Sequence, residues 1–541
     1  MKKYIIPILS AFLVIGCSLD KEPQDKISSN TFWQSENDVN LALMGCYAHI
    51  GGSVYDAYKD GYADNSYCQY SWESVAPVVS AGDISENTDF GYNFVGLRRF
   101  NYFLDNVDNA PISDATKAQV KAEVRTLRAW YYFNMASRFG AVPLIKNSIT
   151  ETEEGQVAPA SETEVINFVI NELAESIPYL PETPIVKSRL SKAAGYVIKA
   201  RVHLFYGQYA EVVAATKAIM DMNKYSLFVV SSLTTDDYTD DYSTFLTFAN
   251  DTEKEKFYKG LRSYEKLFWD ENKENSEVIL NSEFIEDSFN YISLYLLSSN
   301  AGAGWSSITP TVDMVDSYWK ADGTAFTPPS TDTRKTNYNG GAYTAAYLDE
   351  FKNRDTRLYA SILFPGAIWN AVLGTNTFVW QNNGAADNTS KTGYNYRKMV
   401  DPTGNIYRKV NDYPLMRYAE VLLMYAEAQN EVAGADATVY DALNKIRTRV
   451  GMPDVTAGLS QDAMRQLIRN ERRIELANEG FRWNDIRRWG ISSEVMKSIQ
   501  DIQGESAQTR RWEARFVRLP YPISAIDRNP KLKEAQTAKG Y

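Results

Sequence analysis

Histidine and cysteine are both scarce in this chain of 541 residues. It contains only two histidines, His49 and His203, and three cysteines. This scarcity nearly excludes a histidine-rich metal centre and leaves few residues for a catalytic Ser–His or Cys–His pair. His203 lies in an apolar helical pattern, which favours a buried histidine with satisfied ring nitrogens. We expect no metal ion and no cofactor.

Positive charge is also in short supply. The chain has 57 Lys and Arg against 68 Asp and Glu, which gives a net charge of −11. Nucleic-acid binding depends on basic residues that neutralise phosphates, so we expect no nucleic-acid partner. Hydrophobic residues form 44% of the chain, enough for a large core. Aromatic residues are abundant, with 36 Tyr and 11 Trp.

The one long apolar run is at the N-terminus. Residues 4–15 follow Lys2 and Lys3, and the run is too short to span a bilayer, as is typical of a secretory signal. Cys17 follows directly and resembles the lipidated cysteine of bacterial lipoproteins. We predict a signal peptide at 1–16, lipidation of Cys17 and a polar tether over 17–36. The mature protein would then be anchored to the membrane rather than spanning it.

The other two cysteines are Cys46 and Cys68. A secreted protein faces an oxidising compartment, so a disulfide between them is permitted but not required.

Apolar residues recur every three to four positions in several segments, which predicts amphipathic helices. These segments are 37–50, 90–106, 116–139, 191–206 and 209–220, with two more after residue 414. Ser161 and Glu164 form a capping-box pattern that begins another helix. Small residues on one face of 191–206 favour close antiparallel helix pairs, as in tetratricopeptide-like repeats, although no strict 34-residue period is visible.

Residues 224–410 have a different composition, rich in Ser, Thr, Asn, Gly and aromatics. Turn signals at Asp322–Gly323 and Asn339–Gly341 predict short strands and long loops. We therefore predict a single domain at 37–541 that is mainly α. Its tetratricopeptide-like scaffold covers about 37–223 and 411–541, and an irregular, loop-rich insertion with short strands covers about 224–410. Within the insertion, Asp236–Asp241 matches no EF-hand spacing and favours a solvated acidic loop over a calcium site.

The segment 470–490 carries charge inside an apolar pattern. Glu471 falls on the apolar stripe between Ile468 and Ile474, with Arg472 and Arg473 beside it. A buried Glu must be paired, and these neighbouring arginines are the obvious candidates. Gly480 suits the C′ position of this helix, where positive φ is needed.

Glu471 and Glu475 lie one turn apart and raise the alternative of an acid–base pair. Glycosidase carboxylates flank a cleft from opposite sides, whereas these project from one helix among arginines. A structural ion-pair network is the favoured interpretation.

Five segments together resemble the SusD/RagB-like family of outer-membrane lipoproteins, which bind nutrients for TonB-dependent transporters. They are 353–357, 413–428, 443–451, 470–490 and 521–530, in the order that the family has them. The resemblance covers nearly the whole chain. It implies the same helical architecture and a glycan site that includes the region before the helix at Phe90.

Two loops carry the candidate ligand-binding residues: Asp64, Asn65, Tyr67, Tyr70 and Trp72 in one, and Trp305 in the other. Sugars present apolar C–H faces that stack on aromatic rings, and hydroxyls that bond to Asp and Asn. The alternative is that these loops only pack over a local hydrophobic cluster. The resemblance implies that Trp305 faces the ligand.

We therefore expect a non-enzymatic lipoprotein of the outer membrane that faces the cell exterior. It would capture oligosaccharides and deliver them to a SusC-like TonB-dependent transporter. The alternatives are a binder of peptides or another nutrient, a surface glycoside hydrolase, and a helical-repeat scaffold without a small ligand. No catalytic residues are predicted.

Overall fold

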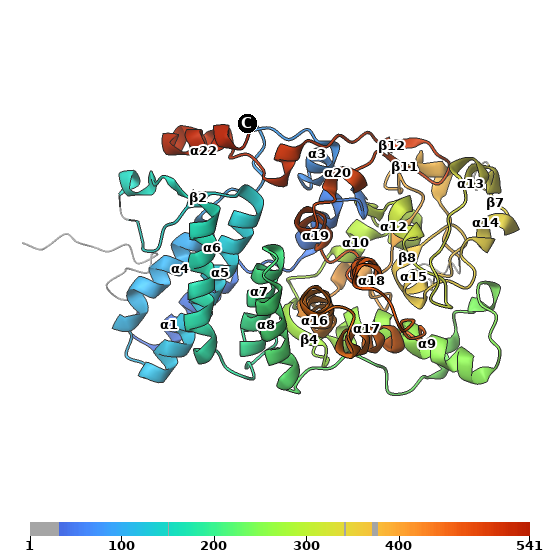
Figure 1. Cartoon of the computed structure of the whole chain (residues 1–541), viewed down its shortest axis with the longest axis horizontal. Helices are drawn as coiled ribbons and strands as arrows, with labels where there is room; N and C mark the ends of the chain where they lie inside the picture. The colour runs from blue at the N-terminus through green and yellow to red at the C-terminus, as the bar shows by residue number, and fades with distance from the viewer. Residues whose placement is uncertain (1–31, 150, 340–341, 370–376) are drawn as a thin grey trace, which may run out of the picture.

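The structure is a computed structural model that describes residues 32–149, 151–339, 342–369 and 377–541. The predicted signal peptide at 1–16 and the predicted lipidation site Cys17 lie outside the described residues, as does most of the tether. Helices predominate and strands are short (Figure 1). The prediction of a mainly α fold is confirmed.

Eleven helices of the described chain carry most of the architecture or position the sites discussed below. They are α1 (Glu36–Tyr47), α4 (Val95–Asn106), α5 (Asp114–Phe139), α6 (Glu162–Ser176), α7 (Lys192–Phe205), α8 (Tyr209–Asp221), α9 (Asp251–Glu265), α16 (Tyr418–Ala433), α17 (Ala437–Arg449), α18 (Gln461–Glu475) and α19 (Arg482–Arg488). Short helices connect them: α2 (Val54–Ala57), α3 (Ala76–Ala81), α10 (Ile292–Leu296), α11 (Ser299–Gly302), α12 (Val312–Asp316), α13 (Thr331–Asn337), α14 (Ala345–Asp349), α15 (Thr356–Ser361), α20 (Ser492–Val495), α21 (Ile523–Arg528) and α22 (Lys533–Ala538).

Helix starts follow the capping signals in the sequence. The Ser161 side chain accepts from the Glu164 backbone, and the Glu164 carboxylate accepts from the Ser161 backbone, so the predicted capping box is present. Consecutive helices pack as pairs, α5 with α6, α7 with α8 and α16 with α17. Gly195 on α7 allows the turn that follows α6 to approach closely, because a Cβ there would lie 2.9 Å from Ile177 and Leu180 side-chain atoms.

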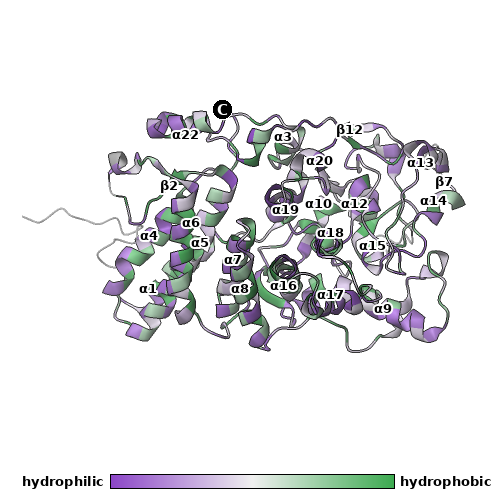
Figure 2. Cartoon of the chain, in the orientation of Figure 1, coloured by the Kyte–Doolittle hydropathy of each residue, from purple (hydrophilic) through white to green (hydrophobic). Residues whose placement is uncertain are grey.

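The two helical blocks join across a long sequence gap. α8 packs against α16, so the N-terminal helices continue directly into the C-terminal ones (Figure 1). Apolar residues line the inner faces and polar ones the outer faces (Figure 2). On α18, for example, Met464, Leu467 and Ile468 pack in one cluster with Leu422 and Leu443. Each fully buried side chain of this kind contributes roughly 1.5–3 kcal/mol.

Residues 224–410 contain the irregular part of the molecule together with α9. All sheets of the described residues have two strands and are antiparallel. The strands are β1 (Ser66–Cys68), β2 (Val142–Pro143), β3 (Pro159–Ala160), β4 (Val278–Ser282), β5 (Ile308–Pro310), β6 (Tyr338–Asn339), β7 (Ala342–Tyr343), β8 (Ile362–Leu363), β9 (Asn395–Tyr396), β10 (Tyr413–Arg417), β11 (Ile499–Gln500) and β12 (Ser506–Gln508). The β4–β10 pair ties this region to the start of α16.

The acidic segment Asp236–Asp241 differs from the prediction of a solvated loop. Asp237 and Asp240 are buried and form ion pairs, Asp240 with Arg262 at 3.1 Å and Asp237 with Lys266 at 3.0 Å. Basic residues on α9 and just after it supply these partners, which the local sequence does not reveal. The acidic run therefore attaches its own loop to α9.

Gly480 is not the C′ residue of α18, because that helix already ends at Glu475. Its backbone has a φ of 81°, and a Cβ there would lie 2.3 Å from the backbone oxygen of Asp56. Glycine is needed because the α2 backbone passes so close.

Cys46 and Cys68 are buried free thiols. His203 is buried as predicted, and its Nδ1 lies 2.5 Å from the Gln208 side-chain oxygen. The prediction that both ring nitrogens are satisfied is wrong, because Nε2 has no hydrogen-bond partner among the described residues. Among the described residues, no helix is long and apolar enough to cross a membrane.

Candidate functional site

Strand pairing brings the two predicted ligand-binding loops together. β1 runs antiparallel to β5, with Tyr67 opposite Thr309. Just beyond the strands, the Gln69 side chain donates to the backbone oxygens of Trp305 and Ser306, at 2.9 and 3.0 Å. Although 236 residues separate Gln69 from Trp305, the two loops form one surface.

Trp72 is the most exposed aromatic side chain of the described chain, with 79% of its surface accessible. Its ring centroid lies 4.6 Å from that of Tyr70, with the planes tilted by 33°. The Tyr70 hydroxyl donates to the Asn388 side-chain oxygen at 3.0 Å, which holds the ring in place. The pair keeps a large ring face in water, where burial would ordinarily be favoured.

A second group of rings surrounds Trp305. Tyr295 on α10 meets Trp305 edge-on, with 5.0 Å between the ring centroids. Tyr58 contacts Tyr295 edge-on at 6.0 Å and stacks on Tyr55 at 6.4 Å. Tyr55 is exposed. Tyr58 is buried and connects Tyr55 to Tyr295. We call the exposed and half-buried rings the aromatic surface: Tyr55, Tyr70, Trp72, Tyr295 and Trp305.

One carboxylate lies among these rings. Glu73 accepts a short hydrogen bond from the Tyr58 hydroxyl. Burial raises the pKa of Tyr70 and of Tyr295, and the negative charge of Glu73 raises both further. Glu73 therefore faces both groups of rings and adds a hydrogen-bond acceptor between them.

Asp64 and Asn65 do not share the aromatic surface. Both are buried, with 4% and 1% of their surface accessible. Arg482 donates two bonds of 2.7 Å to the Asp64 carboxylate. Burial alone would raise the pKa of Asp64, but Arg482 and Arg473 outweigh it and hold the pKa well below its usual range. Arg473 also donates to the Asn65 side-chain oxygen at 2.8 Å.

Tyr67 is half-buried on β1, between the buried Ser66 and Cys68. Side chains alternate along a strand, so the Tyr67 ring lies on the opposite face from the Ser66 and Cys68 side chains. Tyr67 stands beside the aromatic surface without a ring contact to it among the described residues.

Sequence reasoning missed Tyr55, Tyr295, Glu73 and Asn388 as members of the site. Tyr291 lies four residues before Tyr295, but it is the N-cap residue of α10 and takes no part in the site, so this spacing gives no signal for Tyr295. Asn388 carries no signal either, because only the fold brings it to Tyr70.

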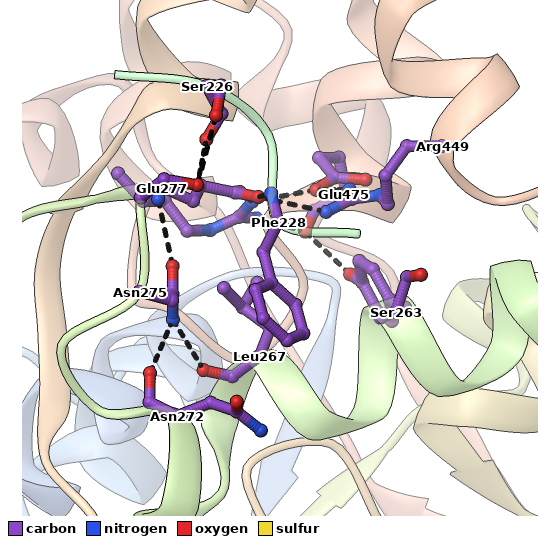
Figure 3. A network of polar contacts seen from close by, with 12 residues as sticks. Ser226, Phe228, Ser263, Leu267, Asn272, Asn275, Glu277, Arg449 and Glu475 are labelled. Atoms are coloured by element: carbon purple, nitrogen blue, oxygen red, sulfur yellow. Dashed lines mark hydrogen bonds and ion pairs between the residues drawn. The ribbon is translucent and has the colours of Figure 1, made fainter. Parts of the chain in front are cut away.

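The charged segment 470–490 forms a second polar centre, entirely inside the protein. Glu475 contacts Arg417 at 2.7 Å and Arg357 at 3.2 Å, and all three side chains are buried. Glu277, directly before β4, contacts Arg417 at 2.8 Å and Arg449 at 3.1 Å. Figure 3 shows Glu277, Glu475 and Arg449 together, near the backbone of Phe228. We call the five charged residues the ion-pair cluster: Glu277, Arg357, Arg417, Arg449 and Glu475.

Glu471 is buried and paired, as predicted, but the predicted partners are wrong. Its carboxylate contacts Arg447 on α17 at 2.8 Å and Arg357 on α15 at 3.0 Å. Arg472 pairs with Asp485 and Arg473 with Asp64. Residues one or two positions apart on a helix do not face each other, so the sequence neighbours point elsewhere.

The ion-pair cluster is built for stability. Burial alone would raise the pKa of Glu475, but Arg449, Arg417 and Arg357 outweigh it and keep the carboxylate ionised. Burial lowers the pKa of Lys398 to about 8, against the attraction of Glu479 at 2.6 Å. Glu475 and Glu277 are fully buried, and each contacts at least two arginines. In the described chain, no group of three or more His, Cys, Asp and Glu residues is arranged to hold a metal ion.

Comparison with known proteins shows the family to which the chain is related. The sequence profile of the SusD family matches residues 264–541, and a profile described as "Starch-binding associating with outer membrane" matches residues 18–204. A SusD-like protein of Formosa agariphila is 24% identical and aligns over 99% of both chains. The starch-binding protein SusD of Bacteroides thetaiotaomicron is also 24% identical, over 99% of this chain and 100% of that one.

A solved structure agrees with these alignments. The crystal structure of a SusD-like protein from Bacteroides fragilis superposes with a TM-score of 0.77 at 25% identity, and the match covers 94% of this chain and 98% of that one. The first profile alone spans half of the sequence, and the fold agrees over nearly all of it. The chain belongs to the SusD family.

Proposed function

We propose that this protein is a cell-surface lipoprotein that binds glycans on its aromatic surface and delivers oligosaccharides to a partner TonB-dependent transporter. The observation that carries the proposal is the exposed Trp72 ring, stacked on Tyr70 and joined through Gln69 to Trp305. Exposed rings that gather in one patch, unlike rings exposed singly, mark ligand-binding surfaces.

The chemistry of the aromatic surface suits a sugar chain. Pyranose rings have apolar C–H faces that stack on Trp and Tyr, and the rings lose little side-chain entropy on binding. Glu73 and Asn388 supply acceptors and an amide for sugar hydroxyls, directly or through water. Two groups of rings with a carboxylate between them fit several sugar units better than one.

Similarity to named relatives supports a glycan rather than a peptide. One relative along the full chain is named a starch-binding protein. One profile description mentions starch binding and the outer membrane. We therefore place this protein at the outer membrane and propose a SusC-like transporter as its partner.

The membrane anchor depends on Cys17. When cells are grown with a clickable fatty acid, the wild-type protein is expected to carry the label, whereas Cys17→Ala is expected to remain unlabelled. Protease digestion or antibody labelling of intact cells tests whether the protein faces the cell exterior. Equal labelling of the two proteins would refute lipidation at this residue.

Catalysis is not part of the proposal. Purified protein incubated for a long period with a bound polysaccharide is expected to release no new reducing ends. Release that a single Asp or Glu substitution abolishes would favour a hydrolase instead.

The direct test removes single rings. Calorimetry against a panel of soluble polysaccharides, beginning with starch, identifies a ligand. Trp72→Ala and Trp305→Ala are each expected to bind it about tenfold more weakly, because one stacking contact contributes on the order of 1–2 kcal/mol.

A melting curve for each variant is the control, and it is expected to match wild type for Trp72→Ala because that ring is exposed. Tyr179→Ala, which removes another exposed ring, serves as the matched variant and is expected to bind normally. Unchanged affinity in both tryptophan variants would leave the loops as packing elements only.

A further inference from the structure

A cavity of about 280 Å³ lies between α5, α7 and α19 and the segment around Gly51. Neither Trp72 nor Trp305 is part of its described lining. Exposed residues at its edge, Gly51, Gly91 and Asn134, open it to the surface. Its volume exceeds that of a single water, roughly 30 Å³, and approaches the roughly 300 Å³ of small-molecule pockets.

Four residues that line this cavity have a buried nitrogen without a hydrogen-bond partner in the part of the chain that the structure describes. They are Arg472 Nη1, Trp483 Nε1, Arg138 Nε and His49 Nε2. Arg472 and Trp483 have only 3% and 4% of their surface accessible. The guanidinium and indole nitrogens are donors only, and leaving such groups unmatched is costly.

The carboxylates at the cavity do not balance these donors. Asp485 accepts from Arg472 and Arg488, at 2.9 Å each. Glu479 is held by Lys398 and Arg417, at 2.6 and 2.7 Å. Asp56, the remaining acid of the lining, already pairs with Lys59.

Positive charge is uncompensated at Arg138, which lines the cavity, and at Arg487, which lies outside the described lining. Arg138 donates to the Phe90 backbone oxygen at 2.7 Å, and Arg487 donates to that of Ser137 at 2.6 Å. Neither has a carboxylate partner among the described residues. Burial lowers the pKa of Arg487, and the charges of Arg518 and Arg138 lower it further against the attraction of Tyr206 and Glu162, so positive charges gather around Arg138.

We propose that this cavity is a binding site for a small oxyanion, such as the carboxylate of a sugar acid no larger than one monosaccharide. The oxyanion would accept from the free donors of Arg472, Arg138 and Trp483 and would neutralise Arg138. The site is distinct from the aromatic surface and does not depend on its function. A neutral sugar of the same size would satisfy the donors but not the charge.

The test is calorimetry of the purified full-length protein with sodium glucuronate, sodium acetate and glucose at constant ionic strength. Glucuronate is expected to bind saturably, and glucose at least tenfold more weakly. Acetate binding as tightly as glucuronate would support the oxyanion site and limit recognition to the carboxylate. Glucose binding as tightly as glucuronate, or no saturable binding of either anion, would overturn the proposal.

Substitutions of residues in the lining test whether glucuronate binds in this cavity. Arg138→Gln is expected to weaken glucuronate binding about tenfold, because one charge-assisted contact is lost. Trp483→Phe keeps the ring, removes the N–H donor and provides a second variant if Arg138→Gln folds poorly. The matched control is Arg511→Gln, since Arg511 also donates to a backbone oxygen, that of Gly82, but lies outside this lining.

Trp72→Ala separates this site from the proposed glycan surface, since it is expected to leave glucuronate binding intact. If both Arg138→Gln and Trp483→Phe bind glucuronate with wild-type affinity, the proposal that glucuronate binds in this cavity is wrong.

Discussion

The ion-pair cluster and the aromatic surface depart from ordinary sequence patterns in opposite directions. Around Glu475, charges occupy positions where a core is normally apolar. Around Trp72, large rings remain in water where packing would normally cover them. The cluster satisfies its charges internally, so its unusual residues serve the fold. The aromatic surface leaves its rings uncovered, so its unusual residues point to a ligand.

The two regions also differ in how many elements hold them. Arg417 ends β10, Arg449 ends α17, Glu475 ends α18 and Arg357 lies on α15. The cluster thus connects the helical scaffold to the irregular region at several points. The loop of Tyr70 and Trp72 is held mainly through Gln69 and the Tyr70 hydroxyl. A change in the cluster should therefore affect folding, and a change on the aromatic surface should affect binding.

The largest expected effect comes from Glu475→Gln. The substitution leaves Arg417, Arg449 and Arg357 short of negative charge in a buried setting. Breaking a buried ion pair from one side costs roughly 3–5 kcal/mol. Chemical denaturation is expected to show that loss, together with a lower melting temperature.

The matched control is Glu494→Gln, which changes an exposed glutamate and is expected to melt like wild type. Glycan affinity per folded molecule is expected to be unchanged in both variants. A Glu475→Gln protein that melts normally but loses its ligand would reverse the roles assigned to the two regions.

Most of the helical scaffold was predictable because its determinants are local. The apolar period of α5, the capping box of α6 and the small face of α7 all lie within one helix or its cap. The partners of Glu471 were not predictable in the same way. Arg357 is more than 100 positions away, and only the fold brings it to Glu471.

The candidate site was only partly predictable, for the same reason. Aromatic residues in polar company marked the loop around Trp72 and the loop of Trp305. The sequence did not show that Asp64 and Asn65 turn inward, because their partners Arg482 and Arg473 are more than 400 positions away. Polar residues beside a ring predict ligand contacts, whereas the fold uses Asp64 and Asn65 as anchors.

A smaller effect is expected at Asp60, which lies near both regions. Its side chain is fully buried and accepts from the Arg482 backbone nitrogen at 3.2 Å. Burial raises the pKa of Asp60 to about 7. A raised folded-state pKa means that the folded protein binds the proton more tightly than the unfolded chain. The associated stability is present below pH 3.8 and is lost as the pH rises to about 7.

Asp60→Asn removes that titration while keeping an acceptor oxygen. Between pH 4 and pH 7, wild type is expected to lose on the order of 3 kcal/mol of unfolding free energy relative to the variant. Denaturant unfolding of both proteins at several pH values measures the difference, and the comparison cancels all other titrating groups. Parallel pH profiles would show that Asp60 has an ordinary pKa.

The smallest expected effect tests whether the aromatic surface depends on polar support as the cluster does. Tyr70→Phe keeps the ring that stacks on Trp72 and removes only the hydroxyl, which donates to Asn388 at 3.0 Å. One neutral, partly exposed hydrogen bond contributes about 0.5–1.5 kcal/mol. Glycan affinity is therefore expected to fall by about threefold, less than in Trp72→Ala, with an unchanged melting temperature. Asn388→Ala removes the other end of the same bond, so the double variant should be no weaker than either single one. A loss as large as that of Trp72→Ala would mean that the hydroxyl contacts the glycan itself, whereas no loss would mean that stacking alone positions the Tyr70 ring.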